Sequence, residues 1–158
     1  MPLLIRRAEK GDNEAIWKVH TDAIKNVCSS HYTPNQVNAW AGKINPNSYL
    51  ESIENKEMLV AEINDEIVGF GQLNLSNGEI EAIYVSSNNP KMGVGQQLFQ
   101  NLESIAKDNG LQKLNLISSL NAFGFYNRLG FIPNKEMGHN ISDGTVLKCV
   151  EMEKDILK

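Results

Sequence analysis

The chain has 158 residues and a formal net charge of −4, and 41% of its residues are hydrophobic while 22% are charged. This composition is close to that of an average soluble globular protein and excludes long disordered or fibrous architectures. The acidic balance speaks against a protein that binds nucleic acid through the phosphate backbone. The length fits one domain, which we expect to span residues 1–158.

The cysteines and the N-terminus exclude further classes. Cys28 and Cys149 lie far apart and form no CxxC pair, so a disulfide scaffold and a cysteine-based zinc site fit poorly, and we expect no metal. The apolar run before Arg6 is too short for a signal peptide or a membrane span. We therefore expect a cytoplasmic protein that does not bind membranes.

The first half of the chain combines one strand with three helices. In chain order, the pattern predicts a strand at Leu3–Arg7, a helix opening at Gly11–Asp12, a helix from Thr33 to Gly42 and a short helix at Asn47–Glu54. The first helix is expected to bury Ile16 and Val27 on one face. The second begins with a capping box, in which Thr33 and Gln36 satisfy each other's backbone amides.

The second half begins with strands. The pattern predicts strands at Met58–Ile63, Ile67–Leu75 and Glu79–Val85, a helix at Val94–Asn109, a strand at Lys113–Ile117, a helix at Asn121–Leu129 and two strands from Phe131 onward. Short turns at Asn64-Asp65 and Asn77-Gly78 make the first three strands an antiparallel meander. The fold class is therefore mixed α/β (α+β), with a mostly antiparallel sheet flanked by helices.

The segment after Val85 carries the clearest functional signal. A strand ends there, a polar loop follows, and Gly93 and Gly95 lie where a helix begins. The first amides of a helix lack internal partners and carry the positive end of the helix dipole, so this site suits a phosphate or pyrophosphate. No Gly-Lys-Ser/Thr sequence supports a P-loop, and Leu98 stands where a dinucleotide fingerprint needs its third glycine. A plain tight turn remains the alternative.

Three segments resemble the GNAT superfamily of N-acetyltransferases. They are Glu79–Val85, the Gly93–Gly95 helix start and the aromatic-Tyr-x₃-Gly-Phe pattern of Phe125–Phe131. Residues 31–41 further resemble the substrate-side helix of a branch of small, uncharacterised bacterial members. The resemblance implies the acyl-CoA N-acyltransferase fold and direct transfer of an acetyl group from acetyl-CoA to a primary amine of a small molecule, in a ternary complex.

Two alternatives stay open. The acceptor amine can belong to a peptide or protein, or the chain can be a CoA-binding regulatory module without turnover. The second alternative is motivated by Pro90, because the family's loop usually carries Gln or Arg at this position and a proline cannot donate an amide hydrogen bond. Lys91 follows where the family usually has glycine, and it adds a charge that can compensate in part. The sequence also leaves a homodimer open.

The resemblance implies two catalytic residues. Glu81 lies two positions before Ile83, which predicts that the two share a face of the strand, and the family often has a carboxylate base near this position. Glu79 competes for this role, and a solvated strand carboxylate is the alternative. Tyr126 matches the family's proton donor to the CoA sulfur, with packing in the core as its alternative.

The resemblance also implies a set of cofactor contacts. Ile83, Tyr84 and Val85 would pair their backbone with the pantetheine arm, and Val85 is the expected donor to the thioester oxygen. The expected pyrophosphate contacts are the amides of Met92, Gly93, Val94, Gly95 and Gln96, with Lys91 beside them. Asn121 matches a cofactor-contacting position or a helix N-cap, and Phe125 lines the same groove or the core.

The acceptor side is less defined by the sequence. His31, Tyr32 and Trp40 are the residues we expect to wall the amine pocket, because an aromatic face attracts a cation. For Trp40, the alternative is a core anchor without contact to substrate.

Overall fold

The computed structural model describes residues 2–88, 93–142 and 144–157. The strands are β1 (Leu3–Arg7), β2 (Glu57–Ile63), β3 (Glu66–Asn74), β4 (Glu79–Val85), β5 (Lys113–Ser119), β6 (Ile132–Ser142) and β7 (Thr145–Asp155). The α-helices are α1 (Asn13–Asn26), α2 (Pro34–Gly42), α3 (Leu50–Asn55), α4 (Val94–Asp108) and α5 (Phe123–Arg128), and short 3₁₀ helices are η1 (Lys10–Asp12), η2 (Cys28–His31), η3 (Pro46–Tyr49) and η4 (Leu120–Ala122).

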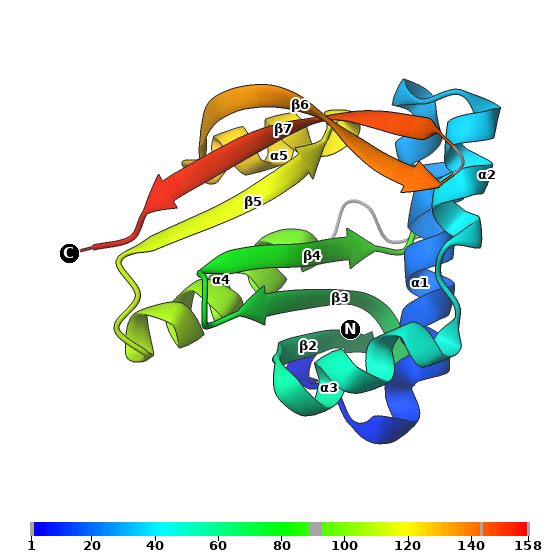
Figure 1. Ribbon diagram of the computed structural model, residues 1–158. Helices are drawn as coiled ribbons and strands as arrows, with labels where there is room; N and C mark the ends of the chain where they lie inside the picture. The colour runs from blue at the N-terminus through cyan, green and yellow to red at the C-terminus, as the bar shows by residue number, and fades with distance from the viewer. Residues whose placement is uncertain (1, 89–92, 143, 158) are drawn as a thin grey trace.

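The strands form one seven-stranded sheet in the order β1-β2-β3-β4-β5-β7-β6. All described neighbours are antiparallel except β4 and β5, which are parallel. These two pair only at Glu79 and Asn115, and beyond that point they separate, so that β5 leaves β4 toward the β6–β7 hairpin (Figure 1). The predicted fold class is confirmed, and the separation leaves the β5-facing edge of β4 without a strand partner.

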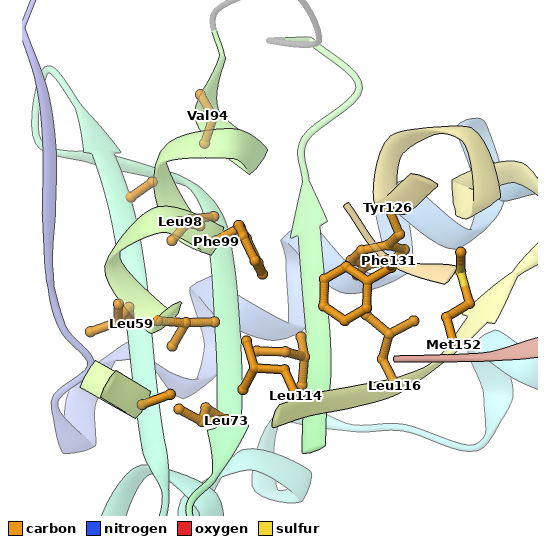
Figure 2. Packing of buried hydrophobic residues seen from close by; sticks show 14 of the residues in the cluster. Leu59, Leu73, Val94, Leu98, Phe99, Leu114, Leu116, Tyr126, Phe131 and Met152 are labelled. Atoms are coloured by element: carbon orange, nitrogen blue, oxygen red, sulfur yellow. The ribbon is translucent and has the colours of Figure 1, made fainter. Parts of the chain in front are cut away.

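Helices cover the sheet on both faces. Helices α4 and α5 pack on one face over the main core, which includes Leu98, Phe99, Leu114 and Phe131, and Figure 2 shows these side chains meeting between α4 and the strands. On the opposite face, α1 packs over a second cluster around Phe70. A third cluster joins α1 and α2 to the end of the β6–β7 hairpin. The separation of β4 from β5 therefore lies between helices on both faces.

A β-bulge in β4 changes which side chains share a face. The register pairs Gln72 with Ala82 but Leu73 with Ile80, so Glu81 is the extra residue. As a result, Ile83 packs into the main core under α4, whereas Glu81 lies on the other face with Tyr84. The prediction that Glu81 and Ile83 share a face was wrong, because strict alternation does not continue through a bulge.

The predicted local signals mostly correspond to real turns and caps. Asn64 and Asp65 have φ of 53° and 65°, the left-handed conformation of a two-residue hairpin turn, and the Thr33 capping box opens α2. The expected buried position of Val27 was wrong. It caps the end of α1 with 40% of its surface exposed, and Ile24 is buried instead.

Candidate active site

A cavity of about 380 Å³ lies on the α1–α2 face where β4 and β5 separate. Its floor comes from β4 and β5, one wall from α2 and the loop after it, and the other wall from the β6–β7 hairpin. The lining residues that carry the argument below are Tyr32, Trp40, Lys43, Glu79, Glu81 and Tyr84. The cavity therefore brings together both candidate carboxylates and two of the three predicted acceptor-side residues.

Glu81 is held by donors from neighbouring elements. Its Oε1 accepts hydrogen bonds from Lys56 Nζ at 2.8 Å and Gln72 Nε2 at 2.5 Å, and Asn74 Nδ2 lies 3.4 Å from Oε2. Burial raises the pKa of Glu81, but the bonds from Lys56 and Gln72 outweigh this effect, and the net pKa is lower than the usual 4.5. Glu81 is therefore an ionised, oriented carboxylate at neutral pH.

Glu79 has a different electrostatic environment in the same cavity. Burial and the negative charge of Glu81 raise the pKa of Glu79, while Lys56 opposes the shift in part. Within the described part of the chain, no ion pair engages the Glu79 carboxylate. Among the described residues, the cavity thus contains one carboxylate in an ion pair, Glu81 with Lys56, and one without an ion pair, Glu79.

Tyr32 connects three parts of the site. Its hydroxyl donates to Lys148 O at 2.7 Å in β7 and accepts from Leu120 N at 2.9 Å, just after β5. The ring meets Trp40 edge to face, with centroids 5.7 Å apart. His31 does not line the cavity; it is exposed and its Nδ1 lies 2.8 Å from Ser30 Oγ. Tyr32 and Trp40 therefore form the aromatic wall, and His31 lies outside it.

We expect the Tyr32→Phe variant to lose stability. The substitution removes the hydrogen bond to Lys148 O and also the one from Leu120 N, which leaves the Leu120 amide without its acceptor. We expect a cost of about 1–3 kcal/mol. Urea denaturation followed by circular dichroism measures the change in the free energy of unfolding. A variant as stable as the wild type would contradict the connecting role of this hydroxyl.

A second cavity, of about 200 Å³, lies beside the end of β4. Ile83, Tyr84 and Val85 line it together with Cys28 and Asn121, and it shares Tyr84 and Ser119 with the larger cavity. The two cavities are therefore neighbours beside the separation of β4 and β5. Burial raises the pKa of the Cys28 thiol to about 11, although the Asn121 side chain lowers it in part, so this thiol is protonated at neutral pH.

Asn121 brings an unpartnered polar atom to this second cavity. Its Oδ1 is buried and accepts no hydrogen bond of ordinary geometry from any residue in the described ranges. It lies inside η4, whose N-cap is Ser119, so the helix-capping alternative was wrong. A buried oxygen without a donor is costly, and a ligand with a polar hydrogen would satisfy it.

The start of α4 is open to an anion. Gly93 is its N-cap, with φ of 68° and no side-chain hydrogen bond to the helix, so the first amides, including those of Val94 and Gln96, have no cap from any residue that the structure describes. A Cβ atom placed on Gly95 would lie 3.2 Å from Phe125 Cζ, which shows how closely the ring approaches the helix start. The predicted contacts Lys91 and Met92, and Pro90, lie outside the described residues.

Tyr126 is buried in the main core. It is 6% exposed, with ring centroids 5.0 Å from Phe125 and 5.7 Å from Phe131, and Figure 2 shows it packed above Phe131. Burial raises the pKa of its hydroxyl, which therefore stays protonated at neutral pH and can act only as a donor. Tyr126 is among the residues that line neither of the two cavities.

In residues 2–88, 93–142 and 144–157, no group of three or more His, Cys, Asp or Glu side chains could hold a metal ion. Among the same residues, no helix is long and apolar enough to cross a membrane.

A sheet whose parallel strands β4 and β5 separate, with two cavities lined by these strands, fits the fold of N-acetyltransferases that use acetyl-CoA. The family model "Acetyltransferase (GNAT) domain" matches residues 28–156, and the chain belongs to this family. The predicted superfamily is confirmed.

Known relatives agree with this assignment. The chain is 28% identical over 127 residues to the uncharacterized N-acetyltransferase YafP of Escherichia coli K12, covering 80% of this chain and 79% of that protein. A GCN5-related N-acetyltransferase structure from Rhodopseudomonas palustris superposes with a TM-score of 0.92 at 22% identity, covering 99% of this chain and 97% of the other. The PaiA N-acetyltransferase from Thermoplasma acidophilum, in complex with coenzyme A, gives 0.82 at 22% identity, covering 98% and 99%.

Proposed function

We propose that the protein acetylates a primary amine of a small molecule by direct attack in a ternary complex. The observation that carries this proposal is that the two cavities share Tyr84 and Ser119 in their linings, at the ends of the separated strands β4 and β5. The smaller cavity suits the pantetheine arm, because the β5-facing edge of β4 offers backbone groups and Asn121 offers a free oxygen. The larger cavity, of about 380 Å³, suits a small acceptor.

Removing the proton from the amine is the main chemical requirement. An alkyl amine with a pKa near 10.4 is neutral in only about one molecule in 10³ at pH 7, so attack needs a proton acceptor. We assign this role to Glu81, acting directly or through water, because it is ionised and held in place by Lys56 and Gln72. Val85 would donate its amide to the carbonyl oxygen as negative charge develops there.

Tyr126 would supply the proton to the departing thiolate. We expect Tyr126→Phe to lower kcat by about 10²-fold while the Kd for acetyl-CoA stays unchanged, because only a donor hydroxyl is deleted. Rapid-quench kinetics and calorimetry measure the two quantities. The matched control is Tyr49→Phe, which removes a hydroxyl bonded to His20 outside both cavities. Equal kcat values for the two variants would assign Tyr126 to packing alone.

Initial-velocity kinetics test the ternary complex. CoA release is measured while acetyl-CoA and an amine are varied together over a panel of small amines and short peptides. Direct attack predicts intersecting double-reciprocal lines and faster release with small amines than with peptides. Parallel lines would instead indicate an acetylated enzyme intermediate and would contradict the proposal.

A further inference from the structure

The acceptor cavity has a second charged position beyond the proposed base. We propose that the acceptor is an aliphatic diamine or polyamine, one of whose amines is acetylated while a second ammonium group binds Glu79 among aromatic rings. This inference rests on the proposed function and narrows its substrate class.

The first support is the difference between the two carboxylates. Lys56, Gln72 and Asn74 all bond to Glu81, so its charge is already compensated by the protein. Glu79 has no such ion pair among the residues described, and its neighbour Glu81 adds repulsion. A partly buried carboxylate without a counter-ion binds a cation favourably, because the cation removes an existing repulsion.

The second support comes from the aromatic side chains in the cavity walls. Tyr32, Trp40 and Tyr84 line the same space as Glu79. The Tyr32 hydroxyl is occupied by Lys148 O and Leu120 N, so this residue offers the cavity only its ring. Aromatic faces beside a carboxylate attract ammonium groups through the ring quadrupole.

The third support is spacing along β4. Glu79 and Glu81 are two positions apart on β4, with Glu81 in the bulge, and both line the cavity, so the cavity has two carboxylates at different places along the strand. The bound cation would therefore lie several bonds from the reacting amine. A linear carbon chain with an amine at each end has this separation, whereas a simple monoamine leaves the Glu79 position unfilled.

Lys43 favours another ligand. Its side chain also lines the cavity and would pair with the carboxylate of an amino acid. Lys43 is exposed, however, whereas Glu79 is half-buried, and a buried charge contributes more to selection than one screened by water. The observations therefore favour a second cation over a zwitterion.

Three acceptors of equal chain length separate these possibilities: putrescine, butylamine and γ-aminobutyrate. We expect kcat/KM for putrescine to exceed that for butylamine by about tenfold, the scale of a charge-assisted contact, with γ-aminobutyrate the poorest acceptor. Glu79→Gln should bring the putrescine-to-butylamine ratio close to one. Glu136→Gln, which makes the same charge change outside the cavity, should leave the ratio as in the wild type.

Other outcomes for kcat/KM would overturn the inference, and each has a different meaning. Equal kcat/KM for putrescine and butylamine, or a ratio unaffected by Glu79→Gln, would contradict it while leaving the proposed function intact. A preference for γ-aminobutyrate would assign the second site to Lys43 and a carboxylate. If no amine in any series were acetylated, the proposed function itself would fail. Circular dichroism of Glu79→Gln confirms that the variant is folded.

Discussion

The Gly95→Glu variant is expected to bind CoA at least about 10²-fold more weakly than the wild type. The new side chain would crowd Phe125, whose Cζ lies 3.2 Å from a Cβ at this position, while Val85 Cγ2 at 3.6 Å is in ordinary contact. It would also place a negative charge at the first turn of α4, where uncapped amides favour an anion. Isothermal titration calorimetry with CoA measures the loss.

The control for this variant adds the same negative charge at a later position of α4. Gln100→Glu adds the same negative charge at an exposed position of α4 beyond its first turn. It should bind CoA within about twofold of the wild type, because the dipole effect falls off after the first turn. If Gly95→Glu also bound CoA normally, the start of α4 would not be the phosphate site.

The second large effect is expected from Glu81→Gln, which should lower kcat by about 10²-fold or more at neutral pH. The substitution keeps the size of the side chain but removes the proton acceptor. The pH dependence provides a sharper result. The wild-type pKa of Glu81 lies below 4.5, so Glu81 stays ionised above that pH. Protonation of Glu81 should therefore lower kcat only below pH 4.5.

Lys56→Met tests the cause of that low pKa. Removing the ammonium that bonds Glu81 leaves burial as the main influence, so the pKa of Glu81 should rise. The acid limb of the kcat profile should then move to higher pH, because Lys56 lowers the pKa of Glu81 in the wild type. A limb that does not move would show that Glu81 is not the group that accepts the proton.

Local sequence signals were sufficient for the meander and its turns. Asn64 and Asp65 tolerate positive φ, so the register of β2 and β3 is determined by residues adjacent in the chain. The Thr33 capping box fixes the start of α2 in the same way. These features could be predicted because their causes lie within a few residues.

The bulge at Glu81 and its ion pair could not be predicted in this way. The bulge depends on how β3 and β4 pair, and Lys56 reaches Glu81 from a segment before β2. Neither Lys56 nor Gln72 belongs to a motif, so no local pattern indicates their role. Asn121 differs: its position was predicted by resemblance, and the unpartnered oxygen supplies a physical reason for that position.

Mass spectrometry with acetyl-CoA labelled in its acetyl group tests the central claim most directly. The protein is incubated with labelled acetyl-CoA and putrescine, and both products are quantified. Acetyl transfer between the two neighbouring cavities predicts labelled acetyl on an amine nitrogen. One CoA should be released for each acetyl group transferred, and neither product should form without the protein. Tight CoA binding without an acetylated product on any amine would contradict it and would identify a cofactor-binding module instead.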